Sequence, residues 1–351
     1  MFGEALRDWD GEFLATRFDE ASGSWFLVGV HSTVLGPGLG GTRMKAYREI
    51  ADATVDVLRL SRAMTFKNAM ARLPFGGGKA VLAVPALPNG DDRHGLLERY
   101  GDLVGSLRGA YVTACDMNTA ERDMDVIATR TEHVMGTTIE RGGSGTSAPD
   151  TALGVYHGIR AALRHAVGSE DPAGRTVAVQ GAGAVGSRLA ELLAADGASL
   201  RVADVDGIRA AAVATAIGAT AVGPDEIVTA ACDVLAPCAT GGVLDAATIA
   251  TLRCGIVAGA ANNQLATPED GERLREAGVV YAPDYVVNAG GVLHLAGHER
   301  LGWSEDEVRA RIEGIGATLA EVFDRAEADG VATSTAADRI AMDRLTAGAS
   351  A

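Results

Sequence analysis

The chain has 351 residues, of which 47% are hydrophobic and 22% charged, a composition typical of a soluble globular protein long enough for two domains. Its net charge of −15 argues against nucleic acid and anionic membranes as partners, so a small anionic substrate would need a local positive site. No apolar run reaches the roughly 18 residues of a membrane span, and the acidic start lacks a signal-peptide core. The four cysteines show no pairing motif, so we expect a cytoplasmic protein with reduced thiols.

The first third of the chain combines strand and helix patterns. Apolar residues recur at spacings of three and four over 48–65, which predicts an amphipathic helix. The segment 36–43 is so rich in glycine that we expect a tight loop. The other elements expected here are strands at 24–31 and 80–84 and a helix at 94–107.

Two lysines in this third lie among apolar residues and glycines. Lys67 has Phe66 and Met70 as neighbours, and Lys79 follows three consecutive glycines. A lysine in such surroundings loses hydration, so its pKa tends to fall and it becomes a candidate anion clamp or general base. The glycines would let a ligand or another backbone approach closely. With Asp116 further along, two lysines and a carboxylate could hold a substrate carboxylate and move protons.

The middle of the chain alternates strand and helix patterns, which predicts a parallel α/β domain. A helix is expected at 187–196, closed by Gly197. The expected strands lie at 176–180, 199–203, 233–236, 255–258 and 278–282.

A glycine fingerprint joins the first of these strands to the helix. Gly181, Gly183 and Gly186 have the G-x-G-x-x-G spacing, and Asp204 ends the next strand 18 residues later. Such glycines let a pyrophosphate reach the N–H groups at the helix start. The carboxylate would accept hydrogen bonds from the adenine ribose and repel a 2′-phosphate. The pattern therefore predicts NAD rather than NADP. Arg201 and Arg209 lie nearby in the sequence, and their positive charges would weaken that preference.

The end of the chain reads as helical. Ser304 and Glu307 form a capping box that starts a long helix ending at Gly330, and a short last helix is expected near Thr335. The final residues, 346–351, are expected to be frayed.

The chain resembles the amino acid dehydrogenases that act on leucine, valine, phenylalanine and glutamate, and within them the branch for apolar substrates. The resemblance extends in order over nearly the whole chain. It rests on the segments 35–43, 64–69, 74–79, 111–116, 181–186, 258–265 and 281–291.

The resemblance implies two α/β domains with a cleft between them. The first, residues 1–133, would bind substrate and form the oligomer, with the segment 325–351 packing back on it. The second, residues 134–324, would be a Rossmann-type domain that binds NAD. A homo-oligomer built through the N-terminal domain is expected, with neither nucleic acid nor membrane as partner.

The resemblance also implies roles near the glycines. Lys79 would be the base that activates water, Asp116 would shuttle the amino-group proton, and Lys67 would bind the substrate carboxylate. Gly40 and Gly41 would line the floor of the substrate site. The expected reaction is the reversible NAD-dependent oxidative deamination of an apolar L-amino acid to a 2-oxo acid and ammonia.

The cofactor contacts implied by the resemblance surround the glycine fingerprint. Thr151 would hold the nicotinamide carboxamide, and Asn262 would contact the substrate amino group or the ribose side of the site. The full set of expected cofactor residues is Gly181, Gly183, Ala184, Val185, Gly186, Asp204, Thr151, Ala239, Asn262 and Asn288.

Substrate choice is divided among the motifs. Ala114 is typical of enzymes for branched chains, the segment 292–295 is closer to phenylalanine enzymes, and 336–340 is closer to valine enzymes. One methylene in such a pocket changes binding by only about 1–3 kcal/mol, so mixed specificity is expected, with phenylalanine slightly ahead of valine and leucine. The pocket wall is expected to comprise Leu39, Ala114, Val292 and Leu295.

Several features stand outside this scheme. Asp150 is an acid at a position where relatives carry an uncharged residue. Its side chain would either point into the cleft or lie in solvent at the start of a helix, and the second orientation is the one that we expect. His294 and His298 share a helix face, but the sequence shows no further ligands at metal spacing, so no metal is expected. The competing functions are a catalytically inactive NAD-binding redox sensor and a dehydrogenase of glutamate or another small substrate.

Overall fold

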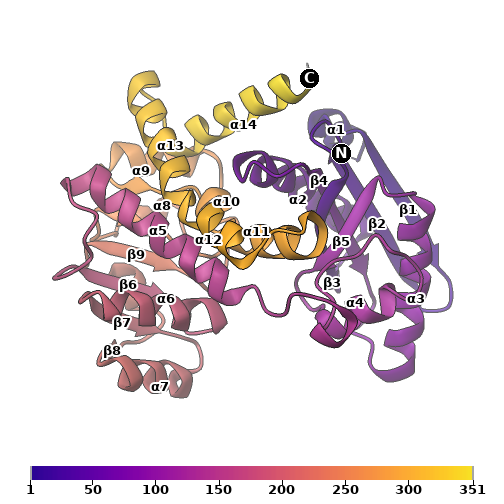
Figure 1. Cartoon of the computed structure of the whole chain (residues 1–351), viewed down its shortest axis with the longest axis horizontal. Coiled ribbons are helices and arrows are strands. Elements are labelled where there is room, and N and C mark those ends of the chain that lie inside the picture. Colours follow the sequence, from indigo (N-terminus) through magenta and orange to yellow (C-terminus); the bar gives the residue numbers. More distant parts are fainter. Residues whose placement is uncertain (1, 350–351) are drawn as a thin grey trace. The chain divides into compact units, whose positions relative to one another are not determined.

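The computed structural model describes residues 2–349 and divides into two compact units (Figure 1). Unit 1 contains Met1–Gly145, Leu295–Gly302 and Ala341–Ala351, and unit 2 contains Thr146–His294 and Trp303–Ile340. The expected fold class, α/β with two domains, is confirmed. The functional limits at residues 133 and 324 stay a prediction. Within the described range, no helix is long and apolar enough to cross a membrane.

Unit 1 contains a five-stranded mixed sheet in the order β1-β2-β4-β3-β5. Strand β2 runs antiparallel to both of its neighbours, the edge strand β1 and β4, whereas β4, β3 and β5 are parallel to one another. The strands are β1 Phe13–Asp19, β2 Ser24–Ser32, β3 Gly38–Lys45, β4 Gly76–Ala83 and β5 Tyr111–Cys115.

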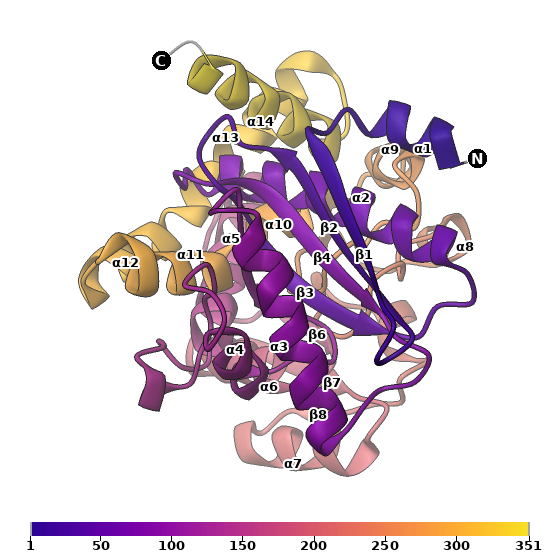
Figure 2. The same cartoon turned by 90° about the vertical axis from the view of Figure 1, so that its right-hand side faces the viewer.

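Helices cover both faces of this sheet (Figure 2). One face packs on α3 through buried residues such as Leu82 and Tyr100, and the other packs on α2 through residues such as Val81 and Val57. Lys79 has the same parity along β4 as Val81, so its side chain belongs to the α2 face. The helices of this unit are α1 Phe2–Trp9, α2 Ile50–Met70, α3 Gly90–Ser106 and α4 Glu121–Ile127, with a short 3-10 turn, η1, at Ile139–Arg141.

The glycine-rich segment 36–43 is not a loop, and that prediction is wrong. Most of it forms β3, which lies between β4 and β5. A Cβ atom on Gly40 would lie 1.9 Å from the carbonyl oxygen of Gly78, so the glycine lets the two strands approach. Tertiary packing therefore overrides the weak strand propensity of glycine. For the same reason β4 begins at Gly76, before the predicted start at residue 80.

Unit 2 contains a six-stranded parallel sheet in the order β8-β7-β6-β9-β10-β11. Numbered from its first strand, this is the order 3-2-1-4-5-6 of dinucleotide-binding domains, whose ligands bind where β6 and β9 diverge. The strands are β6 Thr176–Gln180, β7 Ser199–Ala203, β8 Thr220–Ala221, β9 Val234–Pro237, β10 Ile256–Val257 and β11 Val280–Tyr281.

The remaining helices belong mainly to unit 2. The capping box of Ser304 and Glu307 is confirmed, but the long helix predicted after it is interrupted at Gly314. The last helix continues to Ala349, so the tail expected to fray is helical up to there, and 350–351 lie outside the described residues. The bounds are α5 Ala148–Val167, α6 Ala184–Ala195, α7 Gly207–Ile217, η2 Ile227–Thr229, α8 Ala246–Ile249, α9 Glu269–Glu276, α10 Asp284–Val287, α11 Gly290–Ala296, the π-helix η3 Gly297–Leu301, α12 Glu305–Glu313, α13 Ile315–Asp329 and α14 Thr333–Ala349.

Candidate active site

Lys79 and Asp116 meet in unit 1. Lys79 lies in the middle of β4, is 6% exposed, and places its Nζ 3.1 Å from Asp116 Oδ1. Asp116 directly follows β5, and β3 separates β4 from β5. Gly41 is the β3 residue beside this contact, and a Cβ atom on it would lie 2.9 Å from the Cβ of Asp116. The lysine and aspartate therefore meet across β3 because Gly41 has no side chain.

Arg43 is a third cation at this site, and the sequence reasoning gave it no role. Its Nε donates to Asp116 Oδ2 at 3.0 Å, and its Nη1 donates to Asp56 Oδ2 at 2.9 Å. Tyr47 also donates to Asp56, at 2.6 Å. Arg43 ends the glycine-rich motif and follows the strand parity of Gly41, which is the signal that could have identified it.

Burial and neighbouring charges set the protonation of the Lys79–Asp116 pair. Burial lowers the pKa of Lys79, and the charge of Arg43 lowers it further, against the opposing attraction of Asp116. Burial alone would raise the pKa of Asp116, but Lys79 and Arg43 outweigh it and bring that pKa to about 2. The pair thus combines an ionised carboxylate with a lysine that loses its proton more easily than a solvated one.

Lys67 lies in the last turn of α2, the helix that covers the Lys79 face of the sheet, and its side chain is half-buried. Two residues earlier in α2, Thr65 packs against Gly77, where an added Cβ would lie 2.1 Å from the Thr65 backbone nitrogen. Gly77 is itself two residues before Lys79 on the same strand face. The glycines predicted to admit a ligand or a backbone here admit strands and a helix, so α2, the helix that carries Lys67, packs closely on the sheet face of Lys79.

The expected pocket-wall residues are divided between the units. Leu39 and Ala114 are buried on β3 and β5, and half-buried Leu295 lies 3.9 Å from the Cβ position of Gly136, all in unit 1. Val292 is half-buried in unit 2.

The glycine loop of unit 2 has the features that a pyrophosphate needs. Gly181 has a φ of 103°, which glycine adopts without strain. A Cβ on Gly186 would lie 1.9 Å from the carbonyl oxygen of Gly181, so this glycine allows helix and strand to pack closely. Gly183, by contrast, faces open space and is the N-cap of α6 without a side-chain cap. The first N–H groups of α6, from Ala184 and Val185, are thus left for an anion.

Asp204 is fixed beside this loop. Its two carboxylate oxygens accept hydrogen bonds from the backbone N–H groups of Ala182, at 2.8 Å, and Asp206, at 2.9 Å. The bond from Asp206 is the main cause of its lowered pKa. Arg209 lies 3.6 Å from Asp204, whereas Arg201 donates to a backbone oxygen elsewhere. The carboxylate is therefore ionised and oriented at the end of β7.

The other expected cofactor residues also lie in unit 2. Ala239 is the neighbour of Gly181, and a Cβ on Gly181 would come within 2.9 Å of it. Asn288 donates to Asn262 at 2.9 Å, while the buried Oδ1 of Asn288 has no hydrogen-bond partner among the described residues. An unpartnered buried oxygen next to Asn262 fits a ligand that brings an N–H group. Thr151 donates to Ser147, which leaves its lone pairs able to accept.

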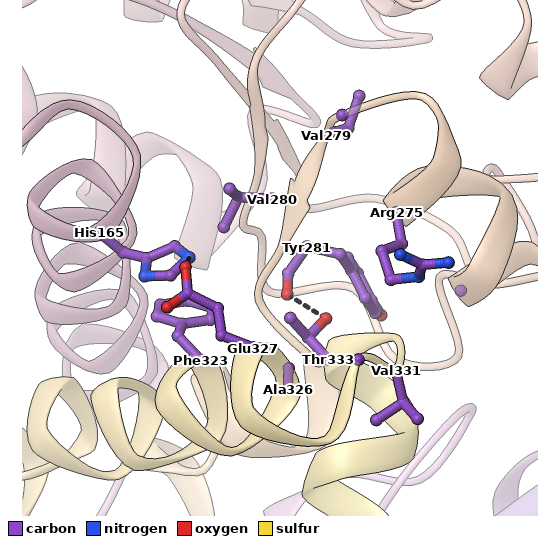
Figure 3. Close-up of a pocket in the computed structure, with 13 residues that line it drawn as sticks. His165, Arg275, Val279, Val280, Tyr281, Phe323, Ala326, Glu327, Val331 and Thr333 are labelled. Atoms are coloured by element: carbon purple, nitrogen blue, oxygen red, sulfur yellow. Dashed lines mark hydrogen bonds and ion pairs between the residues drawn. The ribbon is translucent and has the colours of Figure 1, made fainter.

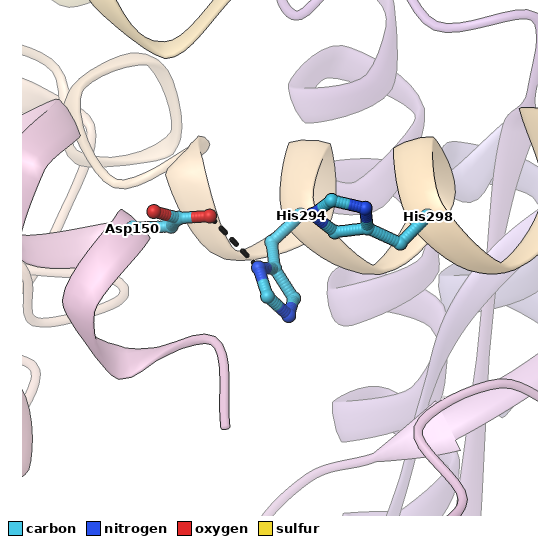
Figure 4. A group of neighbouring side chains, drawn as sticks. All are labelled: Asp150, His294 and His298. Atoms are coloured by element: carbon cyan, nitrogen blue, oxygen red, sulfur yellow. Dashed lines mark hydrogen bonds and ion pairs between the residues drawn. The ribbon is translucent and has the colours of Figure 1, made fainter. Parts of the chain in front are cut away.

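Asp150 lies in the first turn of α5, which confirms the predicted helix start, but its carboxylate is paired rather than only solvated. Its Oδ2 lies 2.8 Å from Nδ1 of His294, one helix turn before His298 (Figure 4). The side chains are 29% and 12% exposed, so the acid is neither free nor simply solvated. The first turn of α11 packs closely here, because a Cβ on Gly291 would lie 2.7 Å from the hydroxyl of Thr151. The pair joins α5 to α11.

Two other features carry no role in this site. Burial raises the pKa of the Cys115 thiol to about 12, so it is not a ready nucleophile. A cavity of about 310 Å³ in unit 2 contains a stacked His165–Phe323 pair (Figure 3). Its lining includes none of the expected site residues: it comprises His165, Gly271, Arg275, Gly278, Val279, Val280, Tyr281, Phe323, Ala326, Glu327, Gly330, Val331 and Thr333.

Comparisons with known proteins agree with this geometry. The model of the Glu/Leu/Phe/Val dehydrogenase dimerisation domain matches residues 27–133, and that of glutamate/leucine/phenylalanine/valine dehydrogenase matches 142–212 and 209–351. Leucine dehydrogenase from Geobacillus stearothermophilus is 42% identical over 97% of this chain and 92% of its own length. Valine dehydrogenase from Streptomyces coelicolor is 44% identical over 93% and 90%.

Among solved structures, L-tryptophan dehydrogenase from Nostoc punctiforme superposes with a TM-score of 0.86 and 37% identity, covering 99% of this chain and 100% of that one. The matched residues extend over both units. They include β4, which carries Lys79, and the glycine loop 181–186. The chain therefore belongs to the Glu/Leu/Phe/Val dehydrogenase family.

Proposed function

We propose that this chain catalyses the reversible, NAD-dependent oxidative deamination of an apolar L-amino acid to the 2-oxo acid and ammonia. The observation that carries this proposal is the buried Lys79, whose Nζ lies 3.1 Å from Asp116 with Arg43 on the far carboxylate oxygen. Such a constellation costs free energy in burial, and a protein that only binds a nucleotide has no use for it. That argues against the inactive redox sensor.

Lys79 acts as the general base in the proposed reaction. Thr151 and Asn288 would hold the nicotinamide, which would supply the hydride acceptor for the substrate Cα and so open that carbon to attack by water. Lys79, with its lowered pKa, takes a proton from that water as it attacks.

Asp116 completes the proton transfer. With a pKa of about 2, Asp116 is ionised and has no proton of its own to donate. It can protonate the departing nitrogen only after it has received a proton from another group. The proton that Lys79 gains from water passes over the 3.1 Å contact to Asp116 Oδ1 and on to the departing nitrogen. As ammonia leaves, the hydroxyl that the water added gives its proton to the neutral Lys79 and the 2-oxo acid forms, and release of that proton to solvent returns Lys79 to its starting state.

Lys67 binds the substrate carboxylate in this proposal, with Gly40 and Gly41 beneath the substrate. The chain carries a net charge of −15, so the substrate anion must be drawn to a local cation. Asn262 contacts the substrate amino group or the ribose side of the cofactor. The wall of Leu39, Ala114, Val292 and Leu295 is apolar, which disfavours glutamate because its second carboxylate would find no partner.

NAD is the proposed cofactor. The ionised Asp204, held by two backbone N–H groups, accepts the ribose hydroxyls and repels a 2′-phosphate. Gly183 and the rest of the loop, together with Ala239, would hold the pyrophosphate at the start of α6. Thr151 and Asn288 hold the carboxamide end.

The preferred side chain is an apolar one. Relatives that are 41–44% identical are named for leucine and valine, and the solved relative at 37% identity for tryptophan. The names of these relatives favour branched aliphatic substrates. The small preference for phenylalanine stays a prediction. The match of residues 27–133 to a dimerisation domain supports a homo-oligomer built through unit 1.

Replacing Lys79 tests the proposal. Lys79→Ala should lower kcat by at least about 10³-fold, the scale of a lost general base, while cofactor binding stays within twofold of wild type. Lys45→Ala is the matched control, because Lys45 is an exposed lysine on the neighbouring strand β3. Turnover by the Lys79 variant close to wild type would refute the assigned base. Lys67→Ala should instead raise KM most.

A further inference from the structure

Two cysteines that no motif connects lie side by side in unit 2. Cys232 and Cys254 each stand two residues before a strand, and the register of β9 and β10 pairs Val234 with Ile256. Backbone contact continues before the strands, since the Cys232 N–H donates to the Arg253 carbonyl at 3.2 Å. Extending the register back by two residues places the two Cα atoms opposite each other at about 4.8 Å, the spacing of neighbouring strands. A disulfide needs roughly 4.4–6.8 Å.

The two thiols are in contact and are not equivalent. The register places Cys232 and Cys254 side by side, and their mutual interaction raises the pKa of Cys232 and lowers the pKa of Cys254. Backbone N–H groups of Leu235 and Ile256 also favour the Cys254 thiolate. Both side chains are half-buried, so neither is sealed from small reagents. Cys254 is thus the better nucleophile, and Cys232 is the thiol beside it.

The other two cysteines lack this arrangement. Burial raises the pKa of Cys115 to about 12 and that of Cys238 to about 11. Cys115 lies in unit 1, and Cys238 stands after β9, at the opposite end of the strand from Cys232. Reactivity toward oxidants should therefore concentrate on one pair.

We propose that Cys232 and Cys254 form a redox-active pair that closes to a disulfide when a hydroperoxide oxidises Cys254. The Cys254 thiolate attacks the peroxide and breaks its O–O bond, giving a sulfenic acid and an alkoxide, or hydroxide when the oxidant is hydrogen peroxide. The Cys232 sulfur then attacks the sulfenic sulfur, forming the S–S bond and releasing water with the Cys232 proton. The two thiols lose two electrons and the peroxide gains them.

The proposed disulfide would connect the amino ends of β9 and β10. The glycine loop and Asp204 lie at the carboxyl ends of their strands, at the other edge of the sheet. Its formation is therefore independent of the deamination proposed above, and the test below needs no substrate.

Peptide mass spectrometry of the whole chain after peroxide treatment tests the proposal. Trypsin cleaves after Arg209, Arg253 and Arg273, so Cys254 is the lone cysteine of 254–273 whereas Cys232 shares 210–253 with Cys238. A Cys238→Ser background removes that ambiguity. We expect the two peptides linked, with a mass about 2 Da below their sum, and separated by dithiothreitol. Free alkylation of both cysteines after peroxide would overturn the proposal.

Single substitutions in the same background separate the two roles. In Cys232→Ser, Cys254 should remain as sulfenic acid and take up dimedone; in Cys254→Ser, Cys232 should take up at least tenfold less. Equal labelling of the two variants would contradict the assigned nucleophile. Dimedone labelling reads the chemistry of one sulfur directly, so a modest loss of stability in either variant does not obscure it.

Discussion

Lysine is rare in this chain: Lys45, Lys67 and Lys79 are the only three among 31 lysines and arginines. Every other strongly basic residue of the chain is an arginine. One of them, Arg43, contacts Asp116 and donates a hydrogen bond to one of its oxygens. Arginine cannot give up its proton in a protein, whereas lysine can when it is buried. The residue type at position 79 therefore matters for its proton as well as for its charge, and that choice points to base chemistry.

The lowered pKa of Lys79 predicts how the deamination rate depends on pH. The base form is the neutral amine, so kcat/KM should rise with pH through the pKa of Lys79 in the free enzyme and then level off. Because burial and Arg43 lower that pKa, the rise should be centred below 10.5, the value of a solvated lysine. A pH profile measures this. A rise centred at 10.5 or higher would show that Lys79 is not perturbed.

The Asp150–His294 pair predicts coupled stability. Removing one partner of a half-buried pair 2.8 Å apart should lower the free energy of unfolding by about 1 kcal/mol. Asp150→Asn and His294→Gln should each have this effect, and the double variant should cost little more than either. Urea unfolding of all four proteins gives the coupling free energy. Fully additive losses would show that the two side chains do not act together.

At the scale of elements, the two glycine-rich segments need glycine for different physical reasons. In unit 1 the glycines admit neighbouring strands and α2, so a segment that looked like a loop is the strand β3. In unit 2 the fingerprint behaves as its spacing predicted, with a strand before it and a helix after it. The difference could not be predicted from local sequence, because it depends on which backbone lies opposite each glycine.

Gly183 and Gly186 form a matched pair for testing the cofactor loop. Gly183→Ala adds a methyl group to open space, so the melting temperature should stay unchanged while NAD affinity falls at least tenfold. Gly186→Ala would drive its methyl within 1.9 Å of the Gly181 oxygen and should destabilise the fold by several kcal/mol. Thermal unfolding and cofactor titration distinguish them. Unchanged NAD affinity in Gly183→Ala would contradict the assigned pyrophosphate site.

At the scale of the whole molecule, sequence patterns located the nucleotide-binding sheet, the two lysines and Asp116. They did not find Arg43, because its role depends on Asp116 and Asp56 meeting it from other elements. They also left Asp150, His294 and the Cys232–Cys254 pair unconnected, since each pair is far apart in sequence and is joined only by tertiary packing. Motifs that bind a ligand lie within short segments of sequence. Side chains that change the charge or packing of a site can come from segments that are far apart in sequence.

The proposed reaction requires an apolar amino acid, NAD and Lys79 together. The most direct test is a spectrophotometric panel in which purified protein meets leucine, valine, phenylalanine, tryptophan or glutamate with NAD or NADP at alkaline pH. We expect reduced cofactor to form with the apolar substrates and NAD, at least tenfold less with NADP or with glutamate, and none with Lys79→Ala. Absence of NADH formation with every apolar amino acid would contradict the account.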